Sequence, residues 1–96
     1  MLHSVIQVKP TLNFEVYVYF DDGTIKLFNM NPLLGVGVFQ QIADVYVFMD
    51  KCTVINHTLA WDMGGNLDPY KCIDIDPETI YNSGVDVEDP LAAEKA

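Results

Sequence analysis

Residues 12–20 (LNFEVYVYF), the pair Asp22-Gly23 and residues 24–30 (TIKLFNM) are the stretch of sequence that decides the fold. β-Branched and aromatic side chains fill both flanking segments, a composition typical of strands. Asp-Gly accepts positive φ at both central positions of a tight turn. We therefore predict an antiparallel hairpin closed by a two-residue turn.

A two-residue turn also predicts which side chains of this hairpin share a face. The first face is aliphatic and should belong to the core; its cross-strand pairs are Phe20 with Ile25, Val18 with Leu27, and Val16 with Asn29. The second face carries large aromatic rings beside charges; its pairs are Tyr19 with Lys26, Tyr17 with Phe28, and Glu15 with Met30. That second face could be open to solvent, covered by a short helix or part of a protein interface.

Shorter extended segments are predicted on either side of the hairpin. Residues 3–9 are typical of an N-terminal strand that Pro10 ends. Residues 52–62 indicate a strand, a turn and a second strand, or one bent strand. We interpret Val45 to Phe48 as a further turn or short strand.

Helical signals in the chain are brief. Asn31-Pro32 is typical of a helix start, with Asn as the cap and Pro in the first position. Residues 36–43 predict a short helix, one face of which carries Val38, Phe39 and Ile42. Asp76-Pro77-Glu78 predicts a last helical turn that runs through Tyr81.

These elements predict an α+β fold. A small, mostly antiparallel sheet is built from the N-terminal strand, the Asp-Gly hairpin and one or two later strands, with one or two short helices beside it. The length fits one domain. We place that domain at residues 1–85. From Asn82 onward the sequence holds Gly, Pro and acids but no aromatic residue, and we expect residues 86–96 to be an acidic, weakly ordered tail.

Charge is the strongest compositional signal. The 96 residues include 14 acids, five lysines and no arginine, for a formal net charge of −9. Such a balance argues against direct binding to nucleic acid or to an anionic membrane. Residues 1–60 hold five acids and three lysines, whereas residues 61–96 hold nine acids and two lysines. A positively charged partner would therefore be attracted to the C-terminal third, although a solvated acidic surface explains the same numbers.

Apolar runs are far shorter than the ~20 residues that cross a bilayer, so we expect a cytoplasmic protein with reduced cysteines. Cys52, His57 and either Asp62 or Asp50 would make a nucleophile, a base and an orienting group only if the fold brought them together. Nothing near Cys52 indicates a reactive thiol. We predict no catalytic residues and no enzymatic activity.

A metal site is the other chemistry that the residues suggest. Asp74, Asp76 and Glu78 would share a face in an extended segment and could bind a hard cation. Helix capping by Asp76 explains the same residues, and the spacing of a calcium loop is absent. We therefore predict neither a metal site nor a cofactor.

Several motifs follow one another in a recognisable order. They are Tyr19-Phe20-Asp21-Asp22-Gly23, Asn31-Pro32-Leu33-Leu34, Val38-Phe39, Ile42-Ala43-Asp44, Phe48, Leu59-Ala60-Trp61, Asn66-Leu67-Asp68 and Ile75-Asp76-Pro77-Glu78-Thr79-Ile80-Tyr81. Over residues 3–81 this set resembles the bacterial domain-of-unknown-function 2442 family. The resemblance implies a small α+β domain, often proposed as the antitoxin half of a toxin–antitoxin-like pair. This sequence departs from the family pattern after Trp61, where Asp62-Met63-Gly64-Gly65-Asn66 replaces the usual proline and Asn-Gly. An insertion, Tyr70-Lys71-Cys72, then precedes the closing motif.

Two functions from different classes remain. The first is a protein-interaction module that binds a small, more basic, toxin-like protein. The second is a small-ligand-binding domain with a groove beside Tyr17, Tyr19, Phe28 and Trp61. The predicted partner-binding residues are Tyr17, Tyr19, Phe28, Trp61, Asp62, Asp68 and Asp74. A homodimer would also cover an exposed strand edge or the aromatic second face.

Overall fold

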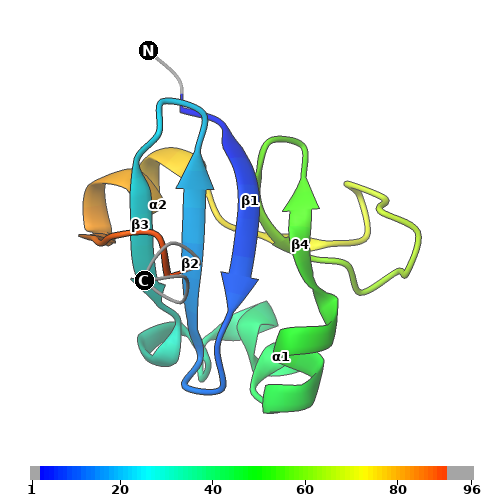
Figure 1. Ribbon diagram of the computed structural model, residues 1–96. Helices are drawn as coiled ribbons and strands as arrows, with labels where there is room; N and C mark the ends of the chain where they lie inside the picture. Colours follow the sequence, from blue (N-terminus) through cyan, green and yellow to red (C-terminus); the bar gives the residue numbers. More distant parts are fainter. Residues whose placement is uncertain (1–2, 91–96) are drawn as a thin grey trace.

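Two antiparallel sheets make up the computed structural model of this chain, which describes residues 3–90 (Figure 1). The first sheet has the strand order β1-β2-β3-β7, with β1 at Val5–Pro10, β2 at Glu15–Phe20, β3 at Ile25–Asn29 and β7 at Val85–Asp86. The second has the order β4-β5-β6, with β4 at Cys52–Ile55, β5 at Thr58–Trp61 and β6 at Ile73–Asp74. The predicted α+β class is confirmed, with the strands divided between two sheets.

Short helices close the ends and the back of these sheets. Two 3₁₀ helices, η1 (Asn31–Leu33) and η2 (Gly37–Ile42), lead from β3 into the α-helix α1 (Val45–Lys51). The second α-helix, α2 (Pro77–Ser83), lies behind the first sheet in Figure 1 and contacts β3. No helix within residues 3–90 is long and apolar enough to cross a membrane.

The β2–β3 hairpin corrects the predicted register by one residue. Val16 pairs with Phe28 and Val18 pairs with Lys26, because the turn contains three residues, 21–23, rather than two. The Phe20 amide donates to the Thr24 carbonyl at 2.9 Å. Gly23 takes a φ of 89°, as the last residue of a three-residue hairpin loop requires.

This shift reverses the faces of β3, because neighbouring side chains of a strand point to opposite sides. Phe28, predicted on the outer face, is a core residue that is 7% exposed, and Met30 is fully buried. Ile25 and Leu27, predicted for the core, pair with Tyr19 and Tyr17 on the outer face. The β2 side of the prediction is confirmed, since its core residues are Val16, Val18 and Phe20.

Two helical predictions also need correction. Val45 to Phe48 form α1 rather than a turn or strand, because the Asp44 carboxylate caps the helix by accepting from the amides of Tyr46 (2.8 Å) and Val47 (3.4 Å). The helix predicted at residues 36–43 is present as η2. A 3₁₀ helix repeats every three residues, so Phe39 and Ile42 share the inner face while Val38 is 56% exposed.

The β4–β5 hairpin confirms the strand, turn and strand predicted for residues 52–62. Asn56 and His57 form its two-residue turn, with φ of 54° and 65°, the positive values of a type I′ turn. The His57 carbonyl accepts from the Val5 amide at 2.9 Å. This bond holds β1 beside the second sheet, as Figure 1 shows for β1 and β4.

Trp61 is the centre of the core that both sheets and the helices enclose. Its side chain is fully buried, and its Nε1–H donates to the carbonyl of Phe48 at 3.0 Å. The Phe48 ring lies 5.5 Å from the Trp61 ring and 5.1 Å from that of Phe14, measured between centroids. The indole therefore joins α1 to β5 through both packing and a buried hydrogen bond.

We expect Trp61→Phe to lower the free energy of unfolding by about 2 kcal/mol, because it opens a cavity and leaves the buried carbonyl of Phe48 without its donor. Urea denaturation followed by circular dichroism measures the change. Tyr46→Phe is the matched control, since Tyr46 is 79% exposed and should change stability by less than about 0.5 kcal/mol. Equal effects of the two substitutions would contradict the role given to Trp61.

Candidate functional site

The seven predicted partner-binding residues lie in three separate parts of the structure. Phe28 and Trp61 belong to the core, with exposures of 7% and 0%. Tyr17 and Tyr19 lie on the outer face of the first sheet, opposite to Phe28. These four aromatic residues therefore do not line one groove. In this conformation Phe28 and Trp61 offer no surface to a partner.

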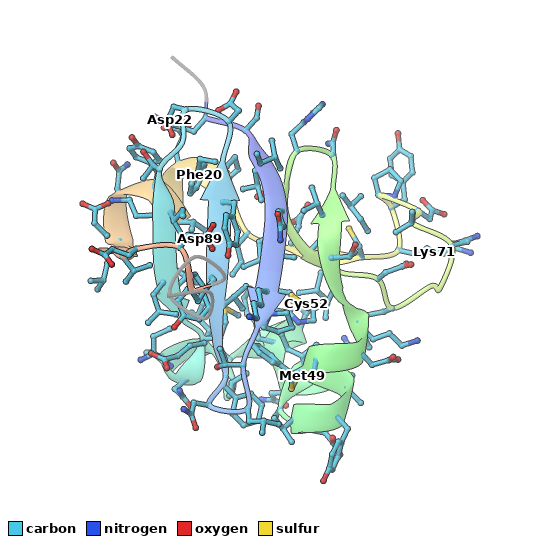
Figure 2. The ribbon with its side chains drawn as sticks, viewed as in Figure 1. Phe20, Asp22, Met49, Cys52, Lys71 and Asp89 are labelled. Carbon is cyan, nitrogen blue, oxygen red and sulfur yellow. The ribbon has the colours of Figure 1, made fainter. Side chains whose placement is uncertain are left out.

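The three remaining residues lie on one segment, residues 62–74, which we call the acidic loop. In Figure 1 it extends to the right of the second sheet, and Figure 2 places Lys71 at its outer end. Asp68 lies within the loop, while Asp62 and Asp74 lie at its two ends. Asp74 belongs to β6, where it pairs with Ala60.

Asp62 shapes the acidic loop from the inside. It is 9% exposed, and its two carboxylate oxygens accept from the amides of Gly65 (3.0 Å) and Leu67 (2.9 Å). Its own amide donates to the carbonyl of Lys51 at 2.9 Å. Asp62 thus positions the loop backbone and is not a free charge at the surface.

Asp68 shapes the outer half of the loop and brings an aromatic ring into solvent. Its carboxylate accepts from the amide of Tyr70 at 2.9 Å, and its carbonyl accepts from the amide of Lys71 at 3.0 Å. This turn leaves Tyr70 95% exposed and Leu67 59% exposed. Neither residue is among the predicted partner-binding residues. The signal for Tyr70 was its place in the Tyr70-Lys71-Cys72 insertion.

Cys72 lies in the same loop as the three carboxylates. Its pKa is raised above the ordinary value of 9.0, first by burial and then by the negative charges of Asp74, Asp62 and Asp68. Its Sγ lies 3.4 Å from the carbonyl of Pro69, a weak hydrogen bond. The charge of the acidic loop therefore disfavours the Cys72 thiolate.

A groove of about 340 Å³ lies between the end of α1 and the acidic loop. It is lined by Asp50, Lys51, Cys52, Thr53, Asp62, Gly65 and Leu67. Figure 2 shows Cys52 at the start of β4, where the chain leaves α1. The lining therefore holds two acids, Asp50 and Asp62, and one lysine, Lys51.

The nucleophile and base considered in the sequence do not meet. Burial raises the pKa of the Cys52 thiol to about 12, so the thiolate is not populated at neutral pH. His57 lies in the turn at the far end of the β4–β5 hairpin, and strands rise by roughly 3.3 Å per residue. The length of β4 therefore separates the two side chains.

The carboxylates considered for a metal are engaged elsewhere. Asp76 caps α2 by accepting from the amide of Glu78 at 2.9 Å. Glu78 accepts from the amide of His3 at 2.6 Å and lies 2.8 Å from its ring Nδ1. Within residues 3–90, no group of three His, Cys, Asp or Glu side chains is arranged to hold a metal ion.

A second polar cluster ties α2 to the rest of the domain; we call His3, Asp22, Glu78 and Tyr81 the terminal clasp. The His3 ring stacks on that of Tyr81 at 3.6 Å between centroids. The Tyr81 hydroxyl donates to Asp22 at 2.8 Å, at the tip of the β2–β3 turn labelled in Figure 2. The sequence signal was the spacing of Glu78 and Tyr81, which places both on one face of a helix.

The outer face of the first sheet is partly covered by the end of the chain. β7 crosses the boundary that we predict between residues 85 and 86, and residues 91–96 of the predicted tail lie outside the described residues. Beyond β7, Asp89 lies across β2 in Figure 2 and accepts from the Tyr19 hydroxyl at 2.9 Å. Of the two outer tyrosines, Tyr19 is consequently 8% exposed.

Comparison with known proteins identifies a protein family. The model of a protein family of unknown function, DUF2442, matches residues 5–86 of the 96. No curated protein and no solved structure matches the chain. The matched range includes both sheets, both α-helices and the whole acidic loop.

We expect the two cysteines to differ sharply in alkylation by iodoacetamide at pH 8. Cys52 should react very slowly until the protein is denatured, because it is only partly exposed and burial raises its pKa to about 12. Cys72 should react more slowly than an ordinary thiol, and Asp74→Asn should speed its reaction by removing a charge that raises its pKa. Mass spectrometry of timed samples measures both rates.

Asp50→Asn is the control for that experiment, since Asp50 is not among the charges that raise the pKa of Cys72. An unchanged Cys72 rate in Asp74→Asn would contradict the clustering of the carboxylates.

The terminal clasp makes the stability of the domain depend on pH in the acidic range. The pKa of Asp22 lies below 3.8, chiefly because the Thr24 amide donates to it and next because the Tyr81 hydroxyl does. The pKa of Glu78 lies below 4.5, chiefly because the His3 amide donates to it. Both shifts are downward, so their contribution to stability is present above those ordinary values and is lost as the pH falls through the folded pKa values.

We therefore expect the urea midpoint of the native chain to fall between about pH 5 and pH 3, and to fall less steeply in Glu78→Gln and Asp22→Asn. Glu88→Gln, at an exposed position, is the control and should keep the native slope. If the urea midpoints of the native chain and the three variants fall with pH at the same rate, the terminal clasp is not the cause of the pH dependence.

Proposed function

The chain belongs to the DUF2442 family of proteins of unknown function, and from that premise we propose that it is a protein-interaction domain. It acts as the antitoxin-like member of a bacterial two-protein pair and binds a more basic partner. The observation that carries the proposal is the acidic loop, in which an exposed aromatic ring lies among clustered carboxylates.

Tyr70 is the principal contact in this proposal. At 95% exposure it is the most exposed large apolar side chain of the described residues, and Leu67, at 59%, lies three positions away. Tyrosine is enriched among the residues that dominate binding energies, because its ring gives a large contact area at little cost in conformational entropy. The proposed partner therefore has an apolar recess that receives Tyr70.

Charge supports a basic partner. Asp68 and Asp74 have no lysine partner within residues 3–90. Their charges lie in the C-terminal third, which has nine acids and two lysines. Complementary charge at the rim of an interface mainly speeds encounter and excludes wrong partners. The association should therefore weaken as salt rises, because screening acts over about 10 Å at 0.1 M.

Co-expression with the product of the adjacent gene tests the proposal. We expect the two proteins to co-purify at moderate salt, and we expect the chain to restore growth to cells in which that product alone arrests it. Tyr70→Ala should weaken the complex by at least ten-fold, or about 1.4 kcal/mol. The double variant Asp68→Asn/Asp74→Asn should slow association and flatten its salt dependence, as measured by surface plasmon resonance.

Tyr46→Ala is the matched control, because Tyr46 is 79% exposed but lies on α1 outside the acidic loop. The proposal is abandoned if no complex forms with the adjacent gene product. If a complex forms but Tyr70→Ala and Tyr46→Ala bind equally well, the acidic loop is not its interface.

A second candidate function is binding of a small cationic ligand in the groove between α1 and the acidic loop. The observation that favours it is the groove itself, of about 340 Å³, with Asp50 and Asp62 in its lining. Burial of such a ligand would involve Leu67 but not Tyr70, which is absent from the lining. Sensitivity to substitution at Leu67 together with indifference to Tyr70→Ala therefore separates this function from the first.

A further inference from the structure

The outer edge of β3 holds a short extended segment from the end of the chain, residues 85–89, which we call the strap. Val85 pairs with Leu27 and Asp86 pairs with Lys26. The next residue, Val87, donates its amide to the Ile25 carbonyl at 3.1 Å. The strap then passes over β2, where Asp89 accepts from the Tyr19 hydroxyl at 2.9 Å (Figure 2).

The strap makes only a short pairing at the edge of the sheet. Val85, its apolar residue in the ladder, remains 64% exposed. The Lys26–Asp86 ion pair is short at 2.7 Å and joins a nearly buried lysine side chain, 10% exposed, to an Asp86 side chain that is 79% exposed. Short edge pairings open more readily than a core. The strap can therefore leave the sheet without unfolding the domain.

The edge that the strap occupies is longer than the strap's own pairing. Backbone groups of successive strand residues alternate in direction, and Ile25 turns its carbonyl outward, so Leu27 and Asn29 turn theirs outward as well. The pairing with β7 stops at Leu27. Within residues 3–90, no strand pairs with Phe28 or Asn29 on this side.

We propose that the β3 edge, together with Tyr19 and Lys26, is a strand-addition site for an extended acidic segment of a partner protein, and that the strap occupies this site in the free chain. The strap shows the chemistry that fits. An apolar residue opposite Leu27 precedes an acid that reaches Lys26, and a second acid three positions later reaches Tyr19. Main-chain hydrogen bonds supply affinity in such additions, and the side-chain positions supply selectivity.

Lys26 supplies the positive charge at this edge. Its side chain is 8% exposed on the inner face, lies over the Tyr81 ring and pairs with Asp86 of the strap. This surface is separate from the acidic loop, so its partner segment differs from the basic partner proposed above.

The geometry disfavours a second copy of this chain as the occupant. Gly84 alone separates α2 from β7. A Cβ at this position would lie 2.8 Å from the Ile80 carbonyl oxygen and 2.9 Å from Cβ of Lys26, so the backbone packs closely here. Because the strap follows α2 so directly, it could reach the β3 edge of another molecule only if the end of α2 unwound.

Competition between the strap and an incoming segment gives the test. An attached strap acts at an effective concentration of roughly millimolar, so its release should increase the affinity for a free peptide. Val87→Pro removes the amide that bonds to Ile25 and leaves every residue of the β3 edge unchanged. The probe is a dye-labelled pentapeptide, Val-Asp-Val-Glu-Asp, which repeats residues 85–89.

We expect Val87→Pro to bind this peptide about ten-fold or more tightly than the native chain, as measured by fluorescence anisotropy. In the Val87→Pro background, Tyr19→Phe should weaken binding by several-fold, since it removes the hydroxyl that holds the second acid. Tyr17→Phe is the matched control on the same face and should leave binding unchanged. A peptide with Asn in place of both Asp residues should bind less tightly.

Hydrogen exchange on the native chain gives a second readout that needs no substitution. Saturating peptide should speed amide exchange at Val87, because it displaces the strap. The proposal is overturned if folded Val87→Pro binds the peptide no more tightly than the native chain, or if exchange at Val87 does not change. Dimerisation of Val87→Pro in sedimentation experiments would assign the edge to a second copy instead.

Discussion

The left-handed conformation of Gly23 is the constraint on which the rest of the structure depends. With a φ of 89°, it ends a three-residue turn and fixes Val16 opposite Phe28. Phe28 therefore enters the core, and the Tyr17 and Tyr19 face points outward. A two-residue turn would bury the other face of β3, since a slip of one residue exchanges the two faces. The docking of α2 and of β7 then follows from this turn, because both contact β3.

Much of the fold could be predicted from short motifs that favour a single local structure. Asp76-Pro77-Glu78 begins a helix because the Asp carboxylate caps it and Pro fits its first turn. The hairpin register could not be predicted, because Asp-Gly closes both two-residue and three-residue loops. The helix at Val45 was missed because β-branched and aromatic residues favour strands. There the Asp44 cap and the burial of Phe48 outweigh propensity.

The candidate site was predictable in charge but not in role. The sequence locates Asp62, Asp68 and Asp74 in one segment, and in the structure the charges of all three raise the pKa of Cys72. It could not show that Asp62 uses both oxygens on loop amides, because that depends on the positive φ of Gly65 and Leu67. The burial of Phe28 and Trp61 could not be predicted for another reason. A large ring at a strand position can close the core or cover an interface, and only the register decides between them.

The acids of the C-terminal third also differ in what they already bind. Asp86 meets Lys26, and Asp89 meets the hydroxyl of Tyr19, so their contacts lie within the domain. The Asp68 carboxylate accepts one hydrogen bond, from the backbone amide of Tyr70, and has no cation to neutralise it within residues 3–90. The acids behind the net charge of −9 therefore belong to two surfaces, which would attract partners of opposite charge. The acidic loop presents charge that lacks a cation, while the β3 edge presents a lysine that the chain's own acid already neutralises. A basic partner at the first surface and an acidic segment at the second would not compete, because they use different residues on different sheets.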